Sequence, residues 1–390
     1  MHSRREPTVT QESAPSHVGT AAGQSPLRVL VITVVHDPDD ARIRYRQLSA
    51  LLELGATVTY AAPFTAYRRP PPAGVTAIDL PRALGRHRLT AIREARRLLH
   101  REGPKHDIAL LHDPELLLTV PGLNARHQPL VVWDVHEDTA AALTMKSWLP
   151  HWLRPAAAAA IRASERWAER HCSLLLAEES YRNRFRRPHP VVPNSVIVPA
   201  DPPPPAGTRR VVYLGRLTEP RGALEMIELG RRLAPEITVE LIGPADSDVA
   251  KPIADAHRRG WVHHHGFVPN REALDLLRGA LAGLALLHDE PNYATSRPTK
   301  VMEYMAFGVP VVTTPNAASA ELVRHYQSGL VVPFASPEAA VEAVRSLRAD
   351  PQLRHRLGEA GRAGAVRDLD WREDGRRFSE LLSTWGLAAR

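Results

Sequence analysis

The chain has 390 residues, of which 44% are hydrophobic and 24% are charged, a composition typical of a globular protein. At roughly 150 residues per domain, this length predicts two or three domains. The single cysteine, Cys172, excludes an intramolecular disulfide framework and a multi-cysteine zinc site. No stretch approaches the ~18 consecutive apolar residues that a membrane-spanning helix needs.

Residues 1–26 are rich in Ser, Thr, Pro and Gly, and no apolar segment follows Arg4 and Arg5. A secretory signal needs such a segment, so we expect a disordered tail here. The single cysteine suits a reducing compartment, and we expect a cytoplasmic protein.

Residues 27–192 form the first predicted domain, in which short apolar runs alternate with amphipathic stretches. The clearest strands are residues 27–35, 57–62, 108–111, 130–135 and 173–177, and residues 40–54 are predicted to be helical. This alternation is typical of βαβ units and predicts a parallel sheet.

Residues 193–208 interrupt the alternation. The run VPNSVIVPADPPPPAG, residues 192–207, carries six prolines in sixteen residues. Proline cannot continue a helix or a central strand, so we expect a semi-rigid linker.

Residues 209–370 form the second predicted domain, and the final stretch, residues 351–385, has a helical pattern throughout. The predicted strands are residues 210–215, 239–242, 261–265, 283–287, 309–313 and 330–332. We therefore predict two α/β domains with parallel sheets.

The net charge of +7 is unevenly distributed. Residues 27–200 hold 24 Lys and Arg against 17 Asp and Glu, residues 201–390 hold 24 against 24, and residues 1–26 hold two of each. The whole excess therefore belongs to the first domain.

The sequence YLGRLTEPRG, residues 213–222, follows a predicted strand and leads into a predicted helix. Arg216 and Arg221 lie five residues apart in this loop. Two guanidinium groups beside the N–H groups of a helix start suit a pyrophosphate. A plain loop with two solvated arginines is an almost equally good interpretation of this motif alone.

The sequence SRPTKVMEYMAFGVPVV, residues 296–312, predicts a helix that begins at or just after Pro298 and ends near Gly308. Lys300 and Glu303 share a face of that helix near its start. A carboxylate there suits two ribose hydroxyls. The simpler alternative is a surface ion pair worth under about 1 kcal/mol.

These two motifs resemble the donor-site signatures of the GT-B glycosyltransferases of family 4, a large retaining group. The resemblance covers residues 27–390 and implies two Rossmann-like domains that face each other across a cleft, with residues 371–390 as a helix that crosses back. It also implies that a nucleotide-sugar donor binds the second domain, that the first domain binds the acceptor, and that no metal or cofactor is required.

Carried over residue by residue, the resemblance implies that Arg216 and Arg221 grip the donor diphosphate and that Glu303 binds the ribose. Family members more often have Lys at position 221, and many have Glu at position 295, where this chain has Thr. The implied donor-binding residues are Gly215, Gly243, Phe267, Val268, Thr295, Ser296, Pro298, Thr299, Lys300 and Glu303.

Three loops after strands of the first domain are expected to face the same cleft. His136 matches the cleft histidine of the family, which lies near the donor sugar, and we predict it as catalytic with Arg216 and Arg221. The candidates on the acceptor side are His36, Asp40, Arg42, His112 and Asp113. N-capping is an alternative role for Asp40 and Asp113, and acidic groups near His36 and His112 also suit a divalent ion.

Residues 82–105 hold eight cations and two carboxylates, with Leu89, Ile92, Ala95 and Leu99 at helical spacing. A basic amphipathic helix suits an anionic membrane surface or a phosphorylated acceptor. A helix packed on the core with a solvated outer face is the more common case. We therefore keep peripheral contact with the inner membrane face as an open hypothesis.

The predicted activity is transfer of a hexosyl unit from a nucleoside-diphosphate sugar, UDP-linked, to the hydroxyl of an unidentified acceptor that is phosphorylated or lipid-linked. A GT-B sugar-nucleotide 2-epimerase is the alternative enzyme, with His112, Asp113 and His136 as acid and base groups. The alternatives of another class are a non-catalytic sugar-nucleotide-binding protein and a nucleic-acid-binding protein. Aromatic residues total only 5% and are not interleaved with the basic residues, which argues against nucleic acid.

Overall fold

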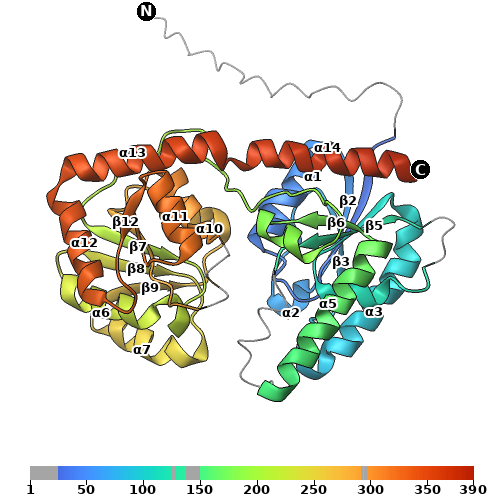
Figure 1. Cartoon of the computed structure of the whole chain (residues 1–390), viewed down its shortest axis with the longest axis horizontal. Coiled ribbons are helices and arrows are strands. Elements are labelled where there is room, and N and C mark those ends of the chain that lie inside the picture. Colours follow the sequence, from blue (N-terminus) through green and yellow to red (C-terminus); the bar gives the residue numbers. More distant parts are fainter. Residues whose placement is uncertain (1–24, 124–127, 138–149, 291–292, 294–296) are drawn as a thin grey trace, which may run out of the picture.

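The computed structural model describes residues 25–123, 128–137, 150–290, 293 and 297–390. Two six-stranded parallel sheets, each covered by helices, form two halves that lie side by side (Figure 1). The strand orders are β3-β2-β1-β4-β5-β6 and β12-β11-β10-β7-β8-β9. Both are the order of a doubly wound sheet. The predicted α/β class with two Rossmann-like sheets is confirmed.

Five of the six strands in the first half coincide with predicted strands. The strands are β1 (Arg28–Ile32), β2 (Thr57–Ala62), β3 (Thr76–Asp79), β4 (Ile108–Leu111), β5 (Leu130–Val135) and β6 (Ser173–Leu176). The helices are the π-helix η1 (Ala41–Leu48), α1 (Ser49–Glu53), α2 (Phe64–Tyr67), α3 (Arg88–Glu102), α5 (Arg154–His171) and the 3-10 helices η2 (Gly85–His87), η3 (Gly103–Lys105), η4 (Pro114–Thr119), η5 (His151–Leu153) and η6 (Glu179–Arg184). The sequence prediction missed β3 because this edge strand is mostly exposed and lacks a continuous apolar run.

All six strands of the second half overlap predicted ones. They are β7 (Arg210–Leu214), β8 (Thr238–Ile242), β9 (Val262–Gly266), β10 (Ala282–Ala285), β11 (Val311–Thr313) and β12 (Gly329–Val331). The helices are η7 (Glu219–Arg221), α6 (Ala223–Leu233), α7 (Ser247–Arg258), α8 (Asn270–Asp275), α10 (Thr299–Ala306), α11 (Ala317–His325), α12 (Pro337–Ala349), α13 (Pro351–Asp368) and α14 (Trp371–Ala389). Strands buried on both faces are apolar along their whole length, which is why the sequence located them well.

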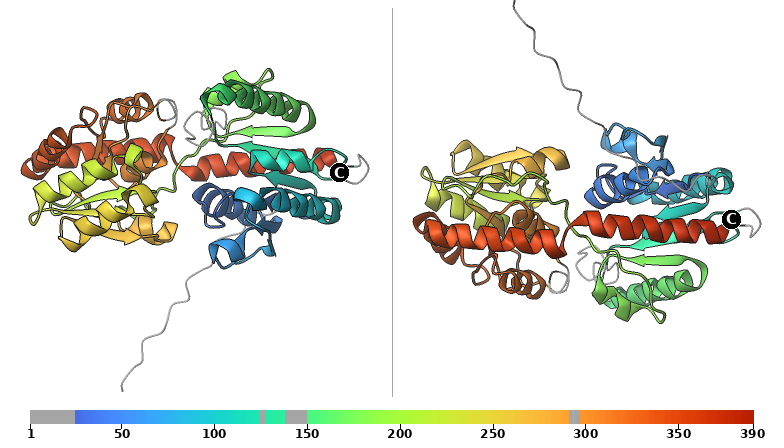
Figure 2. Two further views of the ribbon diagram at one scale, coloured as in Figure 1. Left: turned by 90° about the horizontal axis from the view of Figure 1, so that it is seen from below. Right: turned by 90° about the horizontal axis from the view of Figure 1, so that it is seen from above.

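The last two helices span both halves of the molecule (Figure 2). The predicted helix over residues 351–385 is interrupted at Leu369 and Asp370, and Asp370 accepts a hydrogen bond from the backbone N–H of Arg372, which begins α14. Phe378 and Leu382 of α14 are buried in the core of the first half. The extended linker pairs with this junction, since Val196 bonds to Leu369 and Trp371 through its backbone.

The buried face of α3 differs from the predicted one. Ala91, Ala95, Leu98 and Leu99 are buried, whereas Leu89 is 65% exposed. The sequence pattern is ambiguous because small Ala91 carries little apolar signal, although its position faces the core.

The site-forming loops follow from the strand order. In a doubly wound sheet, ligands bind beyond the carboxyl ends of the strands, where the order of connection reverses. That point lies between β1 and β4 in the first sheet and between β7 and β10 in the second. His36 follows β1 and His112 follows β4, while Gly215 follows β7. The predicted candidates in these loops therefore stand at both reversal points.

Candidate active site

Backbone contacts bring the loops after β7, β8 and β9 together. Gly215 donates to Ile242 and Gly243 donates to Gly266, each at 2.9 Å. Gly243 has φ of 140°, and a Cβ there would collide with the carbonyl of Gly215. Glycine is therefore required at position 243, because it allows the two loops to pack backbone against backbone.

Lys300 lies beneath these loops. Its ammonium is buried, 3.8 Å from the centre of the Tyr213 ring, and within the described residues it has no hydrogen-bond partner. Burial and the charge of Arg221 hold the pKa of Lys300 well below its usual value, although Glu303 opposes them. The interpretation of Lys300 and Glu303 as a surface ion pair is wrong, since the Glu303 side chain and the ammonium of Lys300 are buried.

The two arginines of the β7 loop occupy different environments. Arg221 is largely buried; burial lowers its pKa, but Tyr213 and Tyr293 outweigh this effect and raise it. The side chain of Arg216 is 62% exposed and pairs with Asp246. The charge of Arg221 thus acts on Lys300, whereas Arg216 is exposed and would have to leave Asp246 to bind a ligand beside Lys300.

The helix that carries Glu303 begins where the sequence predicts. Pro298 precedes α10 and Thr299 is its first residue. The Glu303 carboxylate is buried, and burial raises its pKa although Arg46 and Lys300 counteract this. Thr295 and Ser296, predicted as donor ligands, lie outside the described residues.

Phe267 and Val268 follow β9 on the same edge of the sheet. Val268 packs against the core of the second half, while the Phe267 ring is 43% exposed. The guanidinium of Arg69, from the first half, lies 3.6 Å from the centre of that ring. Arg69 is itself held by Asp37, with Nε 3.2 Å from Oδ1. An arginine of the first half therefore contacts a loop that the family resemblance implies for donor binding.

A chain of hydrogen bonds joins the histidines of the first half. Nδ1 of His36 lies 2.6 Å from Oδ1 of Asp113, and Nε2 of His36 lies 3.0 Å from Nε2 of His136. Nδ1 of His136 lies 3.1 Å from the carbonyl oxygen of Asp134. One set of protons satisfies all three contacts: a charged His36 donates to Asp113 and to His136, and a neutral His136 donates to the carbonyl.

The charge on His36 is stabilised by Asp113. Burial alone would lower the pKa of His36, but the hydrogen bond and the charge of Asp113 outweigh burial and raise the pKa to about 9. Asp113 is fully buried and also accepts from the hydroxyl of Thr33 at 3.0 Å. The N-capping role considered for Asp113 is wrong, because its carboxylate makes no capping bond to η4.

This raised pKa predicts a pH-dependent stability. An unfolded histidine has a pKa near 6.5, so the stabilising effect is complete below pH 6.5 and is lost as the pH rises through about 9. We expect wild type to exceed His36→Asn in unfolding free energy at pH 6, and this gap to shrink by roughly 2 to 3 kcal/mol at pH 9.5. Urea unfolding at both pH values measures the gap, and a gap that stays constant would contradict the assignment.

Asp134, which the sequence prediction did not include, is the centre of the buried network. It accepts from Nε and Nη2 of Arg42, each at 2.7 Å, and from Gln47 at 3.0 Å. Nδ1 of His112 lies 3.3 Å from the same carboxylate. Arg42 is therefore a buried partner of Asp134 rather than a group open to an acceptor. A carboxylate within the apolar strand LVVWDV was the available signal, since buried charges require partners.

Asp40 and His112 complete the predicted candidates. Asp40 caps η1 by accepting from the backbone N–H of Arg42 at 2.9 Å, as its alternative role predicted. Burial raises the pKa of Asp40, but the charge of His36 and the hydrogen bonds from the backbone N–H groups of Ile43 and Arg42 prevail and lower it. His112 is buried, and burial lowers its pKa despite Asp134.

His112, Asp134 and His136 each offer a ligand atom within 4.8 Å of one another, a spacing that a metal ion tolerates. Both oxygens of Asp134 already accept from Arg42, however. A divalent cation would have to displace this guanidinium or lie beside its positive charge, so the arrangement fits a metal poorly.

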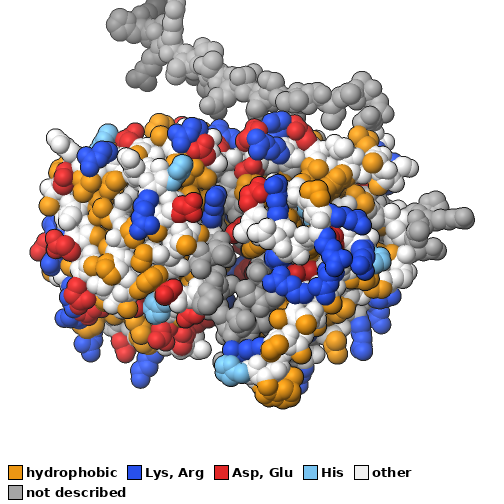
Figure 3. All heavy atoms as spheres, in the orientation of Figure 1, with side chains coloured by type: hydrophobic (Ala, Val, Ile, Leu, Met, Phe, Trp, Pro, Cys, Tyr) orange, Lys and Arg blue, Asp and Glu red, His pale blue; other side chains and the backbone are white. Residues whose placement is uncertain are grey.

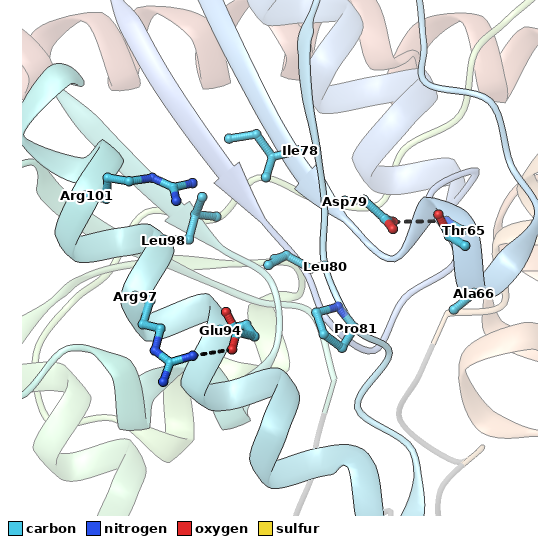
Figure 4. Close-up of a pocket in the computed structure, with 10 residues that line it drawn as sticks. All are labelled: Thr65, Ala66, Ile78, Asp79, Leu80, Pro81, Glu94, Arg97, Leu98 and Arg101. Carbon is cyan, nitrogen blue, oxygen red and sulfur yellow. Dashed lines mark hydrogen bonds and ion pairs between the residues drawn. The ribbon is translucent and has the colours of Figure 1, made fainter.

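A cavity of about 560 Å³ lies on another part of the first half, between α2, β3 and α3 (Figure 4). It contains none of the predicted site residues. Its charged groups have partners: Arg97 pairs with Glu94, and Asp79 accepts from the backbone of Thr65. We assign it no part in the chemistry.

Comparison with known proteins gives a family match for most of the second half of the chain. Residues 198–364 match the family described as Glycosyl transferases group 1. The GDP-mannose-dependent alpha-(1-6)-phosphatidylinositol monomannoside mannosyltransferase of Mycolicibacterium smegmatis is 39% identical over 82 residues, which are 21% of this chain and 22% of that protein. The alpha-maltose-1-phosphate synthase of the same organism is 24% identical over 288 residues, covering 67% of this chain and 72% of that one.

The fold is likewise shared with solved structures. Sucrose-phosphate synthase from Thermosynechococcus elongatus superimposes with a TM-score of 0.72 at 17% identity, over 93% of this chain and all of that chain. This likeness establishes the fold, and the family match concerns residues 198–364, while the chain spans about a fifth of the length of the mannosyltransferase. Residues 198–364 of the protein therefore match a group 1 glycosyltransferase domain, and the chain has the GT-B fold.

Proposed function

We propose that the protein is a retaining, metal-independent glycosyltransferase of family 4 that moves a hexosyl unit from a UDP-linked sugar to an acceptor hydroxyl. The observation that carries this proposal is the buried ammonium of Lys300, without a hydrogen-bond partner in the described part of the chain, beside Arg221 at the reversal point of the second sheet. A buried ammonium and a partly buried guanidinium at this place suit the diphosphate of a donor.

The proposed reaction proceeds on one face of the sugar. The bond between the anomeric carbon and the diphosphate oxygen breaks while the acceptor oxygen bonds to the same carbon from the same side. The acceptor proton passes to an oxygen of the departing diphosphate, so we assign no carboxylate as a nucleophile. Arg221 and Lys300 would stabilise the developing negative charge, with Arg216 joining from the rim, and His136 would face the sugar.

Binding of nucleotides tests this proposal directly. We expect UDP at 100 times its Kd to stabilise the protein by about 2.7 kcal/mol, which raises Tm by several degrees. UMP should act much more weakly, because it lacks the phosphate that the two cations would meet. GDP is measured in the same way, since the mannosyltransferase relative is named for GDP-mannose. No stabilisation by either diphosphate would contradict the proposal, and incubation with UDP-N-acetylglucosamine without acceptor tests the epimerase alternative.

We further propose a phosphorylated or lipid-linked acceptor, bound at the cytoplasmic membrane face. Figure 3 shows Lys and Arg side chains gathered on the first half, at the right, whereas charges of both signs alternate on the second. Near the start of α3, Leu84 and Leu89 are 57% and 65% exposed. Within the described ranges, no helix combines the length and the apolar character that crossing a membrane requires, so contact would be peripheral.

Sedimentation with anionic vesicles tests the membrane part. We expect binding at low salt that is lost at high salt, because surface charges are screened. Arg93→Glu, on the exposed side of α3, should weaken it several-fold, whereas Arg271→Glu, on α8 of the second half, should change it little. Equal losses for both variants would leave only a nonspecific charge effect and contradict a site on α3.

A further inference from the structure

Arg46 of the first half reaches the donor-binding half. Its side chain is 5% exposed, and Nη2 lies 3.4 Å from Oε1 of Glu303, 257 residues further along the chain. Its Nε is buried and has no hydrogen-bond partner among the residues that the structure describes. A buried guanidinium costs free energy unless charge and hydrogen bonds compensate it, so the Glu303 carboxylate is the group that makes this position tolerable.

The local structure aims Arg46 across the cleft. It lies on η1, a π-helix of eight residues, a conformation that is rare and frequent at functional sites. Four residues earlier, Arg42 anchors this helix through Asp134 and through the linker, where it donates to the side-chain oxygen of Asn194 at 3.1 Å. The anchored helix then presents Arg46 toward the second half.

The contact leaves both groups incompletely satisfied. A strong guanidinium–carboxylate bond measures about 2.7–2.9 Å, and this one measures 3.4 Å through a single nitrogen. Burial lowers the pKa of Arg46 and raises that of Glu303, while each opposes this effect on the other. Such a pair still has capacity for further hydrogen bonds, which a polar ligand between the halves would supply.

We propose that Arg46 is a positioning residue of the donor site: it holds the Glu303 carboxylate as an acceptor for the ribose hydroxyls, so that the first half takes part in nucleotide recognition. This inference rests on the proposed function and on the ribose-binding role that the family resemblance implies for Glu303. It makes donor binding and the approach of the two halves one event, because Arg46 belongs to one half and Glu303 to the other.

Whether removal of Arg46 strengthens or weakens nucleotide binding distinguishes this role from that of an ion pair that only holds the two halves together. If the pair only held the halves together and the donor had to break it, removal of Arg46 would tighten nucleotide binding. If Arg46 positions Glu303, its removal weakens binding, and the weakening depends on the ribose hydroxyls. A purely structural role predicts a loss that is the same with and without those hydroxyls.

The experiment is calorimetric titration of the full chain with UDP and with 2′,3′-dideoxyuridine 5′-diphosphate. We expect Arg46→Gln to raise the Kd for UDP about tenfold, since hydrogen bonds to charged groups are worth roughly 1.5–3 kcal/mol, and to leave the weaker Kd for the dideoxy nucleotide nearly unchanged. Arg46→Lys should recover part of the affinity. Glu303→Gln should lose as much as Arg46→Gln, and the double variant no more than Glu303→Gln alone.

The matched control is Arg44→Gln, on the same helix, where the arginine pairs with Asp39 of its own half. We expect its Kd for UDP to equal that of wild type. Tighter binding by Arg46→Gln, or equal losses for both nucleotides, would overturn the inference. If Arg46→Gln does not fold, Arg46→Lys and Glu303→Gln provide the same comparison. Wild type that binds neither nucleotide would instead overturn the proposed function.

Discussion

Replacing Arg221 by alanine is expected to lower kcat/KM for the sugar donor by about 10²–10³-fold, the range seen when one preorganised donor to a developing negative charge is removed. Arg221 is largely buried and lies beside Lys300 at the reversal point of the second sheet. Fixed cations in a site of low dielectric stabilise a leaving diphosphate strongly, because they need no reorganisation during the reaction. Steady-state kinetics with the donor identified by thermal stabilisation gives the ratio.

Arg216→Ala is the matched control for this prediction. Its side chain is 62% exposed and paired with Asp246, so we expect a loss of no more than about tenfold. The sequence motif predicts the same diphosphate-binding role for both arginines, and only the difference in their burial distinguishes them. Equal losses of kcat/KM for Arg216→Ala and Arg221→Ala would show that Arg216 turns inward during catalysis. They would contradict the expectation that Arg221 contributes more. Unchanged turnover in Arg221→Ala would remove it from the mechanism.

Asp134→Asn is expected to produce the largest loss of stability, about 3–5 kcal/mol, because it leaves the buried guanidinium of Arg42 without its countercharge. Asp134 accepts two hydrogen bonds from Arg42 and one from Gln47, and it has no exposed surface to admit water. Denaturant unfolding measures the loss. We also expect lower activity at permissive temperature, since Nδ1 of His136 lies 3.5 Å from the Asp134 carboxylate, whose charge the substitution removes.

Asp246→Asn provides the comparison for Asp134→Asn. It makes the same chemical change in a carboxylate that also pairs with an arginine, but at an exposed place, so its cost should stay under about 1 kcal/mol. Similar costs for the two variants would mean that the Arg42–Asp134 pair is dispensable. A double variant, Asp134→Asn with Arg42→Met, should recover part of the loss, since no buried charge then remains unpaired.

The strands and the loops of the site could be predicted from the sequence, because each depends on a pattern of a few neighbouring residues. Strands such as residues 108–111 are buried on both faces, so they are apolar without interruption. Loops that follow parallel strands meet at one edge of the sheet. The sequence therefore predicts that His36 and His112 lie close together. The start of α10 after Pro298 was predicted from the position that proline favours.

The ion pairs between distant parts of the chain could not be predicted from the sequence. Asp134 pairs with Arg42, 92 residues away, and Glu303 pairs with Arg46, 257 residues away. No local pattern encodes such a contact, because it depends on how helices and sheets pack. The same limit explains Leu89, which fits an apolar helical stripe yet lies exposed.

By itself, the sequence determined the two α/β domains with parallel sheets, the Pro-rich connection, the excess positive charge of the first half and the loops in which polar residues gather. These follow from hydrophobic periodicity and turn chemistry, which act over a few residues. Only the tertiary structure decided which of those polar residues are buried and which charge faces which. It placed Arg221 inside and Arg216 outside, and it joined Arg46 to Glu303, because desolvation and Coulomb energy depend on distances that exist only after the chain has folded.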